Sequence, residues 1–296
     1  MEIIMYQVDA FTDQLFGGNP AGVIADASKL DDNSMQGIAK EMNLSETAFV
    51  IPKDNNNFIV RFFTPKCEVD LCGHATIATF YTLAKKGYIK SIDNGIVTIH
   101  QETKVGKLPV DIYFKDNQVE KVLMYQGEPE VLGDVNKIDV LSNIFKLDSK
   151  DISLEGYSIK PQIVSTGLPD IIMPVRNKKL LNDMDINYNV LTKISEELKV
   201  GGVHAFTIDD GEIYCRNFAP ALGINEESAT GTANGALIYY LKKNNVLKGN
   251  EILSNQGQAL GRPSKIYCEI HEKDDSYIVK VGGRAKIIIE GVINID

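Results

Sequence analysis

Gly73-His74-Ala75 opens an apolar run that ends at Tyr81-Thr82-Leu83, and Gly231-Thr232-Ala233 opens a similar run that ends at Tyr239-Tyr240-Leu241. Three more pairs of similar stretches precede these runs in the same order: Gly18–Ile24 with Gly167–Met173, Ala48–Ile51 with Ala205–Ile208, and Arg61–Pro65 with Arg216–Pro220. Four matches in register indicate an internal duplication. We therefore predict two similar domains with a cleft between them. The positions that differ between the copies are the first candidates for chemistry.

The composition limits the class of partner. A length of 296 residues suits two domains. The net charge of -9 argues against nucleic acid, which needs a basic surface, and against anionic membranes. No apolar run is long enough to span a membrane, and the first residues read as a strand rather than a signal peptide. We therefore expect a cytoplasmic protein whose four cysteines are reduced thiols.

Hydrophobic spacing predicts helices among many strands. Asp31–Met42 has apolar residues at helical spacing, while His74–Lys86 and Thr232–Lys243 are apolar on nearly all sides, which is typical of buried helices. Strands outnumber helices without β-α-β alternation, so the predicted class is α+β. We predict a first domain at 1–118 around a helix at about 74–86, and a second at 119–296 around a helix at about 232–243. The sequence leaves open whether the last strands return to the first domain.

Both buried helices start in a way that suits an anion. Their first residues, Gly73 and Gly231, let a ligand approach the backbone, and a helix N-terminus presents unpaired N–H groups with a partial positive charge. A substrate carboxylate is the natural ligand for such a site. The alternative is that both are ordinary capped helices, with Thr232 as one cap.

Glu46 is the clearest charged difference between the copies. It precedes the repeated Ala-Phe pair, whereas Val203-His204 precedes the second pair. Such a carboxylate is a candidate general acid or base whose pKa burial would raise. Alternatively, Ser45 and Glu46 cap or solvate a turn. His74, at a helix N-terminus, is expected to stay neutral and to orient a substrate or relay a proton.

A metal site is not predicted. Cys67, Cys72 and His74 lie close in sequence, but structural zinc usually needs four ligands in paired short spacings. Cys215 and Cys268 are isolated and have no second histidine cluster beside them.

Motifs along the whole chain resemble those of the PhzF (phenazine biosynthesis-like) isomerase family. They are Asp9–Thr12, Gly18–Val23, Asn43–Phe49, Arg61–Pro65, Glu68–Thr76, Glu226–Ala233, Gln256-Gly257 and Gly261–Ser264. The resemblance implies the diaminopimelate epimerase-like fold, with two pseudo-symmetric domains, each a barrel-like, mostly antiparallel sheet around a central helix. It also implies a homodimer that works without a cofactor.

The same resemblance implies roles for single residues. Glu46 matches the acid/base that moves a proton on the substrate, and His74 matches a residue that binds the substrate carboxylate. Glu227 falls where the family usually has an aspartate, and it completes the candidate catalytic set with Glu46 and His74. The candidate substrate-binding residues are Asn19, Ser45, Cys72, Gly73, Thr230, Gly231 and Thr232.

The leading functional hypothesis is therefore a cofactor-independent isomerase that moves a hydrogen on a small carboxylate-bearing substrate. One alternative is an amino-acid racemase or epimerase. Related racemases use two thiols, but here Thr230 stands opposite Cys72, which disfavours that mechanism. A second alternative is a ligand-binding homologue without catalysis. Glu46 argues against it, because a pure binder of carboxylates gains nothing from a nearby anion.

Overall fold

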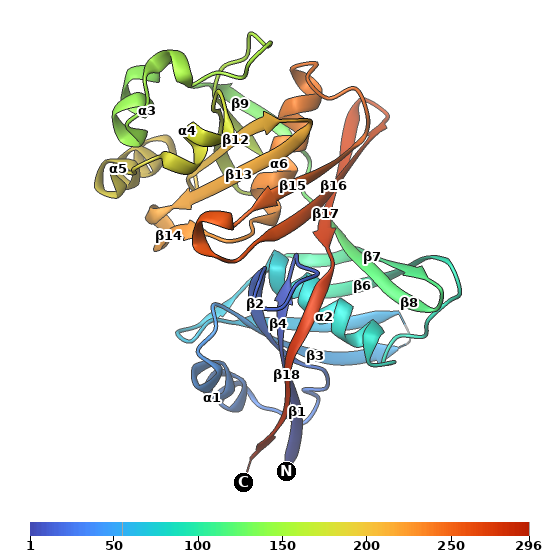
Figure 1. The fold of residues 1–296 in the computed structure, drawn as a ribbon. Helices are drawn as coiled ribbons and strands as arrows, with labels where there is room; N and C mark the ends of the chain where they lie inside the picture. The colour runs from blue at the N-terminus through green and yellow to red at the C-terminus, as the bar shows by residue number, and fades with distance from the viewer. Residues whose placement is uncertain (55, 296) are drawn as a thin grey trace. The chain divides into compact units, whose positions relative to one another are not determined.

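The computed structural model describes residues 1–54 and 56–295, which form two compact units (Figure 1). The first unit comprises Met1–Tyr125 and Gly282–Asp296, and the second comprises Gln126–Val281. The sequence placed a single boundary after residue 118. In the structure, residues 118–125 stay with the first unit because they form a strand antiparallel to the preceding one. The C-terminal strand also belongs to the first unit, where it pairs with the N-terminal strand.

The first unit is built on one mixed, mostly antiparallel set of strands. They are β1 (Glu2–Ala10), β2 (Asn19–Ile24), β3 (Thr47–Asp54), β4 (Asn57–Phe63), β5 (Glu68–Val69), β6 (Gly95–Thr103), β7 (Gly106–Lys115), β8 (Gln118–Tyr125) and β18 (Ala285–Asn294). β1 is antiparallel to β18 and β2, β2 is parallel to β3, and β3 is antiparallel to β4. β4 is antiparallel to β5 and parallel to β6, and the antiparallel pairs β6–β7 and β7–β8 follow.

The second unit repeats this pattern of pairing. Its strands are β9 (Glu130–Asp134), β10 (Gln162–Ser165), β11 (Pro169–Pro174), β12 (Val203–Asp209), β13 (Glu212–Ala219), β14 (Ile224–Glu227), β15 (Glu251–Gln256), β16 (Ser264–Lys273) and β17 (Ser276–Gly283). β10–β11 is antiparallel, β11–β12 parallel and β12–β13 antiparallel. β13 is antiparallel to β14 and parallel to β15, and β15 is antiparallel to β16. The order of parallel and antiparallel pairs from β1 to β7 thus recurs from β10 to β16, as the duplicated sequence predicts.

One buried helix lies inside each set of strands. α2 (Gly73–Lys85) contacts β1, β2, β3, β7, β8 and β18, so strands from both ends of the series meet the same helix. α6 (Gly231–Lys243) contacts β10, β11, β12, β15 and β16 in the same way. A helix surrounded by strands must be apolar on nearly every face, which explains the two apolar runs. The predicted α+β class, with barrel-like sheets around central helices, is confirmed.

The remaining helices lie at the edges of the units. α1 (Asp32–Met42) begins where the Asp31 carboxylate accepts a hydrogen bond from the Ser34 N–H, and it ends at Asn43 in the left-handed conformation. α3 (Ile138–Phe145), α4 (Lys178–Asp183) and α5 (Tyr188–Leu198) belong to the second unit and pack over a separate hydrophobic cluster. None of the helices in the described part of the chain is long and apolar enough to cross a membrane.

Candidate active site

Glu46 lies in the turn between α1 and β3, and its backbone is fixed to the neighbouring strand. The Gly22 N–H donates to the Glu46 carbonyl at 3.0 Å. A Cβ at Gly22 would lie 2.6 Å from the Thr47 hydroxyl, so glycine leaves the room that the Thr47 side chain occupies beside β2. The repeated glycine-containing stretch of β2 therefore holds Glu46 in place.

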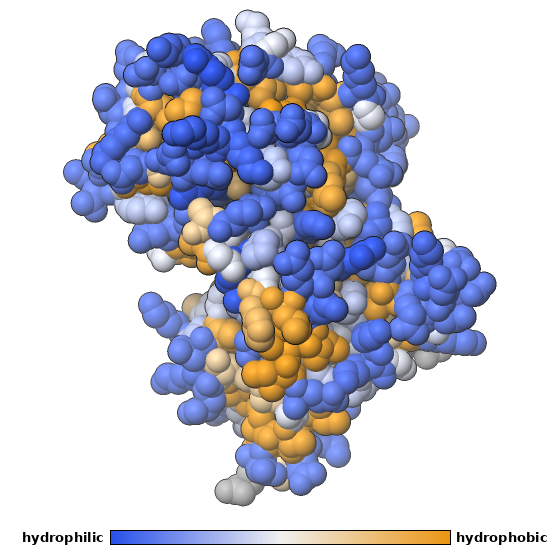
Figure 2. All heavy atoms as spheres, viewed as in Figure 1, coloured by the Kyte–Doolittle hydropathy of each residue, from blue (hydrophilic) through white to orange (hydrophobic). Residues whose placement is uncertain are grey.

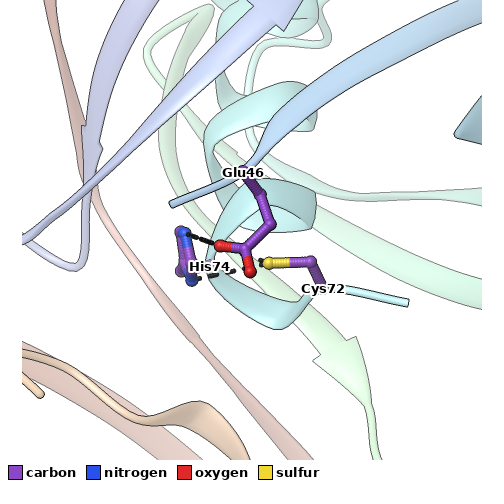
Figure 3. A group of neighbouring side chains, drawn as sticks. All are labelled: Glu46, Cys72 and His74. Atoms are coloured by element: carbon purple, nitrogen blue, oxygen red, sulfur yellow. Dashed lines mark hydrogen bonds and ion pairs between the residues drawn. The ribbon is translucent and has the colours of Figure 1, made fainter. Parts of the chain in front are cut away.

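The start of α2 brings two more polar side chains to Glu46 (Figure 3). His74 Nε2 lies 3.2 Å from Glu46 Oε2 and 3.3 Å from the Ser45 hydroxyl. Cys72 Sγ lies 3.5 Å from His74 Nδ1 and 3.9 Å from His74 Nε2. His74 and Cys72 are buried, whereas the Glu46 side chain keeps about a fifth of its surface exposed. Figure 3 shows the three side chains converging on one point beside the first turn of the helix.

The protonation states differ from those expected from the sequence. Burial raises the pKa of Glu46, but its contacts with His74, Ser45 and Cys72 outweigh burial, and the pKa is lowered overall. Burial lowers the pKa of His74, yet its contacts with Cys72 and Glu46 raise it well above its usual value. The expectations of a raised Glu46 pKa and a neutral His74 are therefore wrong. The contact between the two residues therefore favours the charged form of each.

Burial favours the protonated form of Cys72 in this arrangement. Burial raises its pKa, and the Glu46 charge raises it further, while the charge of His74 acts in the opposite direction. The resemblance made Cys72 a candidate substrate-binding residue, and the structure places it in contact with His74. Cys67, five residues earlier, is exposed, and its sulfur lies 3.8 Å from the Thr64 hydroxyl.

The two central helices begin without a side-chain cap. Cys72 and Thr230 occupy the N-cap positions in an extended conformation, and neither makes a capping bond within the described residues. By contrast, Asp31, Asn177 and Asn187 cap α1, α4 and α5. Thr232 lies inside α6 rather than at its cap, so the alternative of an ordinary helix capped by Thr232 is wrong. A helix start without a side-chain cap leaves first-turn N–H groups that can bind a ligand or water.

Glu227 lies beside the start of α6 in a polar network of the second unit. Its carboxylate accepts a hydrogen bond from the Thr230 hydroxyl at 2.6 Å. Gln256 donates to the Glu227 carbonyl at 2.8 Å and to the Thr230 hydroxyl at 3.2 Å. Asn234 donates to the side-chain oxygen of Gln256 at 3.0 Å and to the Thr230 carbonyl at 2.8 Å. Gln256 and Asn234 were not predicted as site residues, although Gln256 stands in one of the motifs.

Asp170 is a second carboxyl group of this unit that sequence reasoning missed. Burial raises its pKa to about 8, a hydrogen bond from the Gly202 backbone opposes that rise, and the charge of Glu227 adds to it. The comparison of the two sequence copies could have identified Asp170. Asp170 stands in the repeated Gly167–Met173 stretch where the first copy has Ala21, so the comparison that singled out Glu46 also distinguishes Asp170.

The repeated arginines hold the acidic stretches in front of the helix starts. Arg61 forms a two-bonded ion pair with Glu68 at 2.8 and 3.0 Å, and Arg216 does the same with Glu226 at 2.9 and 2.8 Å. The bonds from Arg61 outweigh the burial of Glu68 and, with Lys104, lower its pKa to about 2. These glutamates are therefore structural anchors, which leaves Glu227 as the carboxylate beside α6.

The predicted site residues form one group in each unit. In the first unit Ser45, Glu46, Cys72 and His74 are in contact, and Gly73 is the first residue of the same helix. Asn19 lies at the start of β2, and the carbonyl of the next residue is 3.5 Å from the Ser45 hydroxyl. In the second unit Glu227, Thr230, Gly231 and Thr232 lie at the start of α6.

Comparison with known proteins identifies the family to which this chain belongs. A family model described as phenazine biosynthesis-like protein matches residues 8–291. The chain belongs to the phenazine biosynthesis-like (PhzF) family. It is 39% identical to an uncharacterized isomerase of Clostridium acetobutylicum, with 97% of this chain and 96% of the relative covered. It is 36% identical to the uncharacterized isomerase YddE of Escherichia coli K12, with 96% of each covered.

Solved structures agree with this membership. A PhzF-family phenazine biosynthesis protein of Bacillus anthracis covers all of both chains at a TM-score of 0.86 and 27% identity. A probable proline racemase of Agrobacterium radiobacter K84 matches at a TM-score of 0.65 and 14% identity, over 99% of this chain and 93% of that one, which shows a shared fold alone. The family and the names of its members identify the chain as an isomerase.

Proposed function

We propose that this isomerase moves a hydrogen on a small carboxylate-bearing substrate, with Glu46 as the proton carrier. The observation that carries the proposal is the buried Glu46–His74 pair beside the uncapped start of α2. An ionised carboxylate can take a proton from an activated carbon and return it at another carbon. Substrate and product therefore have the same atomic composition, and the proposed reaction needs no cofactor.

The charged state of the pair suggests how substrate binding would activate it. The contacts of His74 favour its protonated form, so the imidazole and the N-terminus of α2 would both attract a substrate carboxylate. When the substrate shares the positive charge of His74, Glu46 loses part of the contact that lowers its pKa. Exclusion of water acts in the same direction. Glu46 would thus become a stronger base when a substrate is in place.

Glu227 is proposed as the second acidic residue of the site. Its carboxylate is fixed by the Thr230 hydroxyl next to the N-terminus of α6, as expected of a group that must keep one orientation. The expected interdomain cleft, with one substrate contacting both helix starts, stays a prediction from the duplicated sequence.

The second candidate function is a thiol-based racemase, and the chemistry of Cys72 disfavours it. Its buried thiol has a raised pKa, and Thr230, which stands at the corresponding position of the second copy, has no useful acidity near neutral pH. The shared fold with a proline racemase carries no information on substrate.

Deuterium incorporation tests the proposal. Native protein is incubated in deuterium oxide with the ligands that co-purify with it and with a panel of amino and hydroxy acids, and each is examined by mass spectrometry and NMR. We expect label at a carbon of one substrate, together with a shifted double bond or hydrogen position. Label that appears only at an inverted Cα would instead identify a racemase.

Two variants assign the proton carrier in the same assay. Glu46→Gln preserves shape but removes the base, so turnover should fall by about 10²–10⁴-fold. Cys72→Ala should retain most of the activity. An active Glu46→Gln enzyme with an inactive Cys72→Ala enzyme would overturn the carboxylate mechanism and support the thiol-based one.

A further inference from the structure

We propose that Glu46, Cys72 and His74 form a binding site for a thiophilic divalent cation, with Zn²⁺ as the natural candidate. One oxygen, one sulfur and one nitrogen of these residues all lie within 4.8 Å of one another. The sequence considered Cys67 as a partner of Cys72 and His74. The structure replaces Cys67, which is exposed, with Glu46 from the turn before β3.

The distances suit a single tetrahedral ion. Zinc binds sulfur at about 2.3 Å and nitrogen or oxygen at about 2.0–2.2 Å, so neighbouring ligand atoms in a tetrahedron lie roughly 3.3–3.6 Å apart. His74 Nε2 is 3.2 Å from Glu46 Oε2 and 3.9 Å from Cys72 Sγ. The third pair, Cys72 Sγ and a Glu46 carboxylate oxygen, lies within 4.8 Å, so shifts of up to about one ångström bring all three atoms to zinc distance.

One ligand atom is also poorly satisfied by the protein alone. Glu46 Oε2 is buried and, within the described part of the chain, has no aligned hydrogen-bond donor, although it forms the ion pair with His74. A buried carboxylate oxygen of this kind gains more from a cation than one already surrounded by donors. The main-chain positions of the ligands are fixed by β2 and by the start of α2, so the site is largely preformed.

The donor set selects the class of metal. Thiolate and imidazole favour Zn²⁺ and its spectroscopic substitute Co²⁺ over Mg²⁺ and Ca²⁺, which prefer oxygen ligands. A thiolate and a carboxylate together match the two positive charges of the ion, and the protons of the thiol and imidazolium pass to water. Three protein ligands leave the fourth position open, as in zinc sites that accept a small ligand.

Occupancy would block the isomerase. The ion ties up the carboxylate and the imidazole that are proposed to move the proton and to hold the substrate, so metal and substrate should compete. This consequence rests on the proposed function, whereas metal binding itself does not.

Cobalt titration tests the site without any knowledge of the substrate. Chelator-treated native protein is titrated with Co²⁺ and then with Zn²⁺ while absorption is recorded. We expect one equivalent of Co²⁺ to produce the strong visible bands of a tetrahedral site and a thiolate-to-cobalt charge-transfer band, both removed by Zn²⁺. Absence of stoichiometric binding would overturn the proposal.

Three variants locate the ligands. Cys72→Ser should abolish the charge-transfer band, and both Cys72→Ser and Glu46→Gln should weaken binding by at least about tenfold. Cys67→Ser removes the exposed thiol and should leave the spectrum unchanged. A spectrum that survives Cys72→Ser, or that is lost in Cys67→Ser, would overturn the assignment.

Competition is measured separately, by the deuterium assay at rising Zn²⁺ concentration. We expect inhibition that rising substrate concentration relieves. Stoichiometric binding with undiminished turnover would overturn the blocking role while leaving the site intact. A native protein that binds zinc but labels no compound would count against the proposed function alone.

Discussion

At the scale of single residues, Asp170 makes a prediction about pH. Its pKa in the folded protein is about 8, above the ordinary value of 3.8, because burial and the Glu227 charge favour the protonated form. Such a group contributes stability that is fully present below about pH 4 and is lost as pH rises through about 8. The side chain of Asp170→Asn is neutral at every pH. The free energy of unfolding of this variant, relative to that of the native protein, should therefore increase as pH rises. The expected gain is on the order of 1 kcal/mol per pH unit within this window.

Thermal unfolding of both proteins between about pH 5 and pH 9 checks this expectation, since other titrating groups are common to both and largely cancel. The difference in Tm should grow in favour of Asp170→Asn toward high pH. A difference that is constant across this range would show that Asp170 is ionised in the folded protein.

At the scale of elements, the uncapped start of α2 predicts a backbone contribution to ligand binding. Gly73 is its first residue and follows Cys72 in an extended conformation, which is the geometry that proline accepts. A Cβ at Gly73 would meet the sulfur of Met124 at 3.7 Å, an ordinary contact, so both Gly73→Pro and Gly73→Ala should fold. Only proline removes the N–H. We expect Gly73→Pro to bind a carboxylate ligand more weakly than Gly73→Ala by about 1–3 kcal/mol.

Isothermal titration calorimetry with a ligand found by the deuterium assay measures this difference, and circular dichroism verifies that both variants are folded. Equal affinity of the two variants would remove the α2 backbone from the site.

The elements also show what sequence reasoning can and cannot reach. The central helices were predicted because burial on all sides leaves an apolar run, and the duplication was predicted because both copies keep the residues at the starts of these helices. α3 and α4 were not predicted, because helices of 8 and 6 residues are too short to establish a period.

Within the site, Glu46 and His74 were predicted from the comparison of the two copies and from the family resemblance, and the structure brings them into contact. Their charge states could not be predicted, since each pKa depends on a contact across 28 residues of chain that only the fold creates. Gln256 shows the same limit, because its amide reaches from the end of β15 to Thr230 at the start of α6. Neither relation has a local signature in the sequence.

At the scale of the whole molecule, a hydrophobic surface of the first unit bears on assembly. Ile4 and Val292 are directly paired across β1 and β18, and both are about half exposed. Ile4 also lines a surface hollow with Tyr88, which is similarly exposed. Figure 2 shows hydrophobic residues gathered over β18 and β1. Contiguous apolar surface of this kind marks contact sites, and the resemblance to the PhzF family implies a homodimer. We therefore propose that Ile4, Tyr88 and Val292 face a second copy of the chain.

Light scattering after size-exclusion chromatography tests this assembly. The native protein should have twice the chain mass of 32.7 kDa, and Val292→Glu should shift it toward the monomer, because burial of an unpaired charge opposes association. Ile96→Glu is a matched control, since Ile96 is equally exposed on β6 of the same unit but lies outside the proposed surface. A monomeric native protein would contradict the assembly. Equal dissociation by both substitutions would contradict an interface at β1 and β18, because a charge outside the proposed surface would then have the same effect as one on β18.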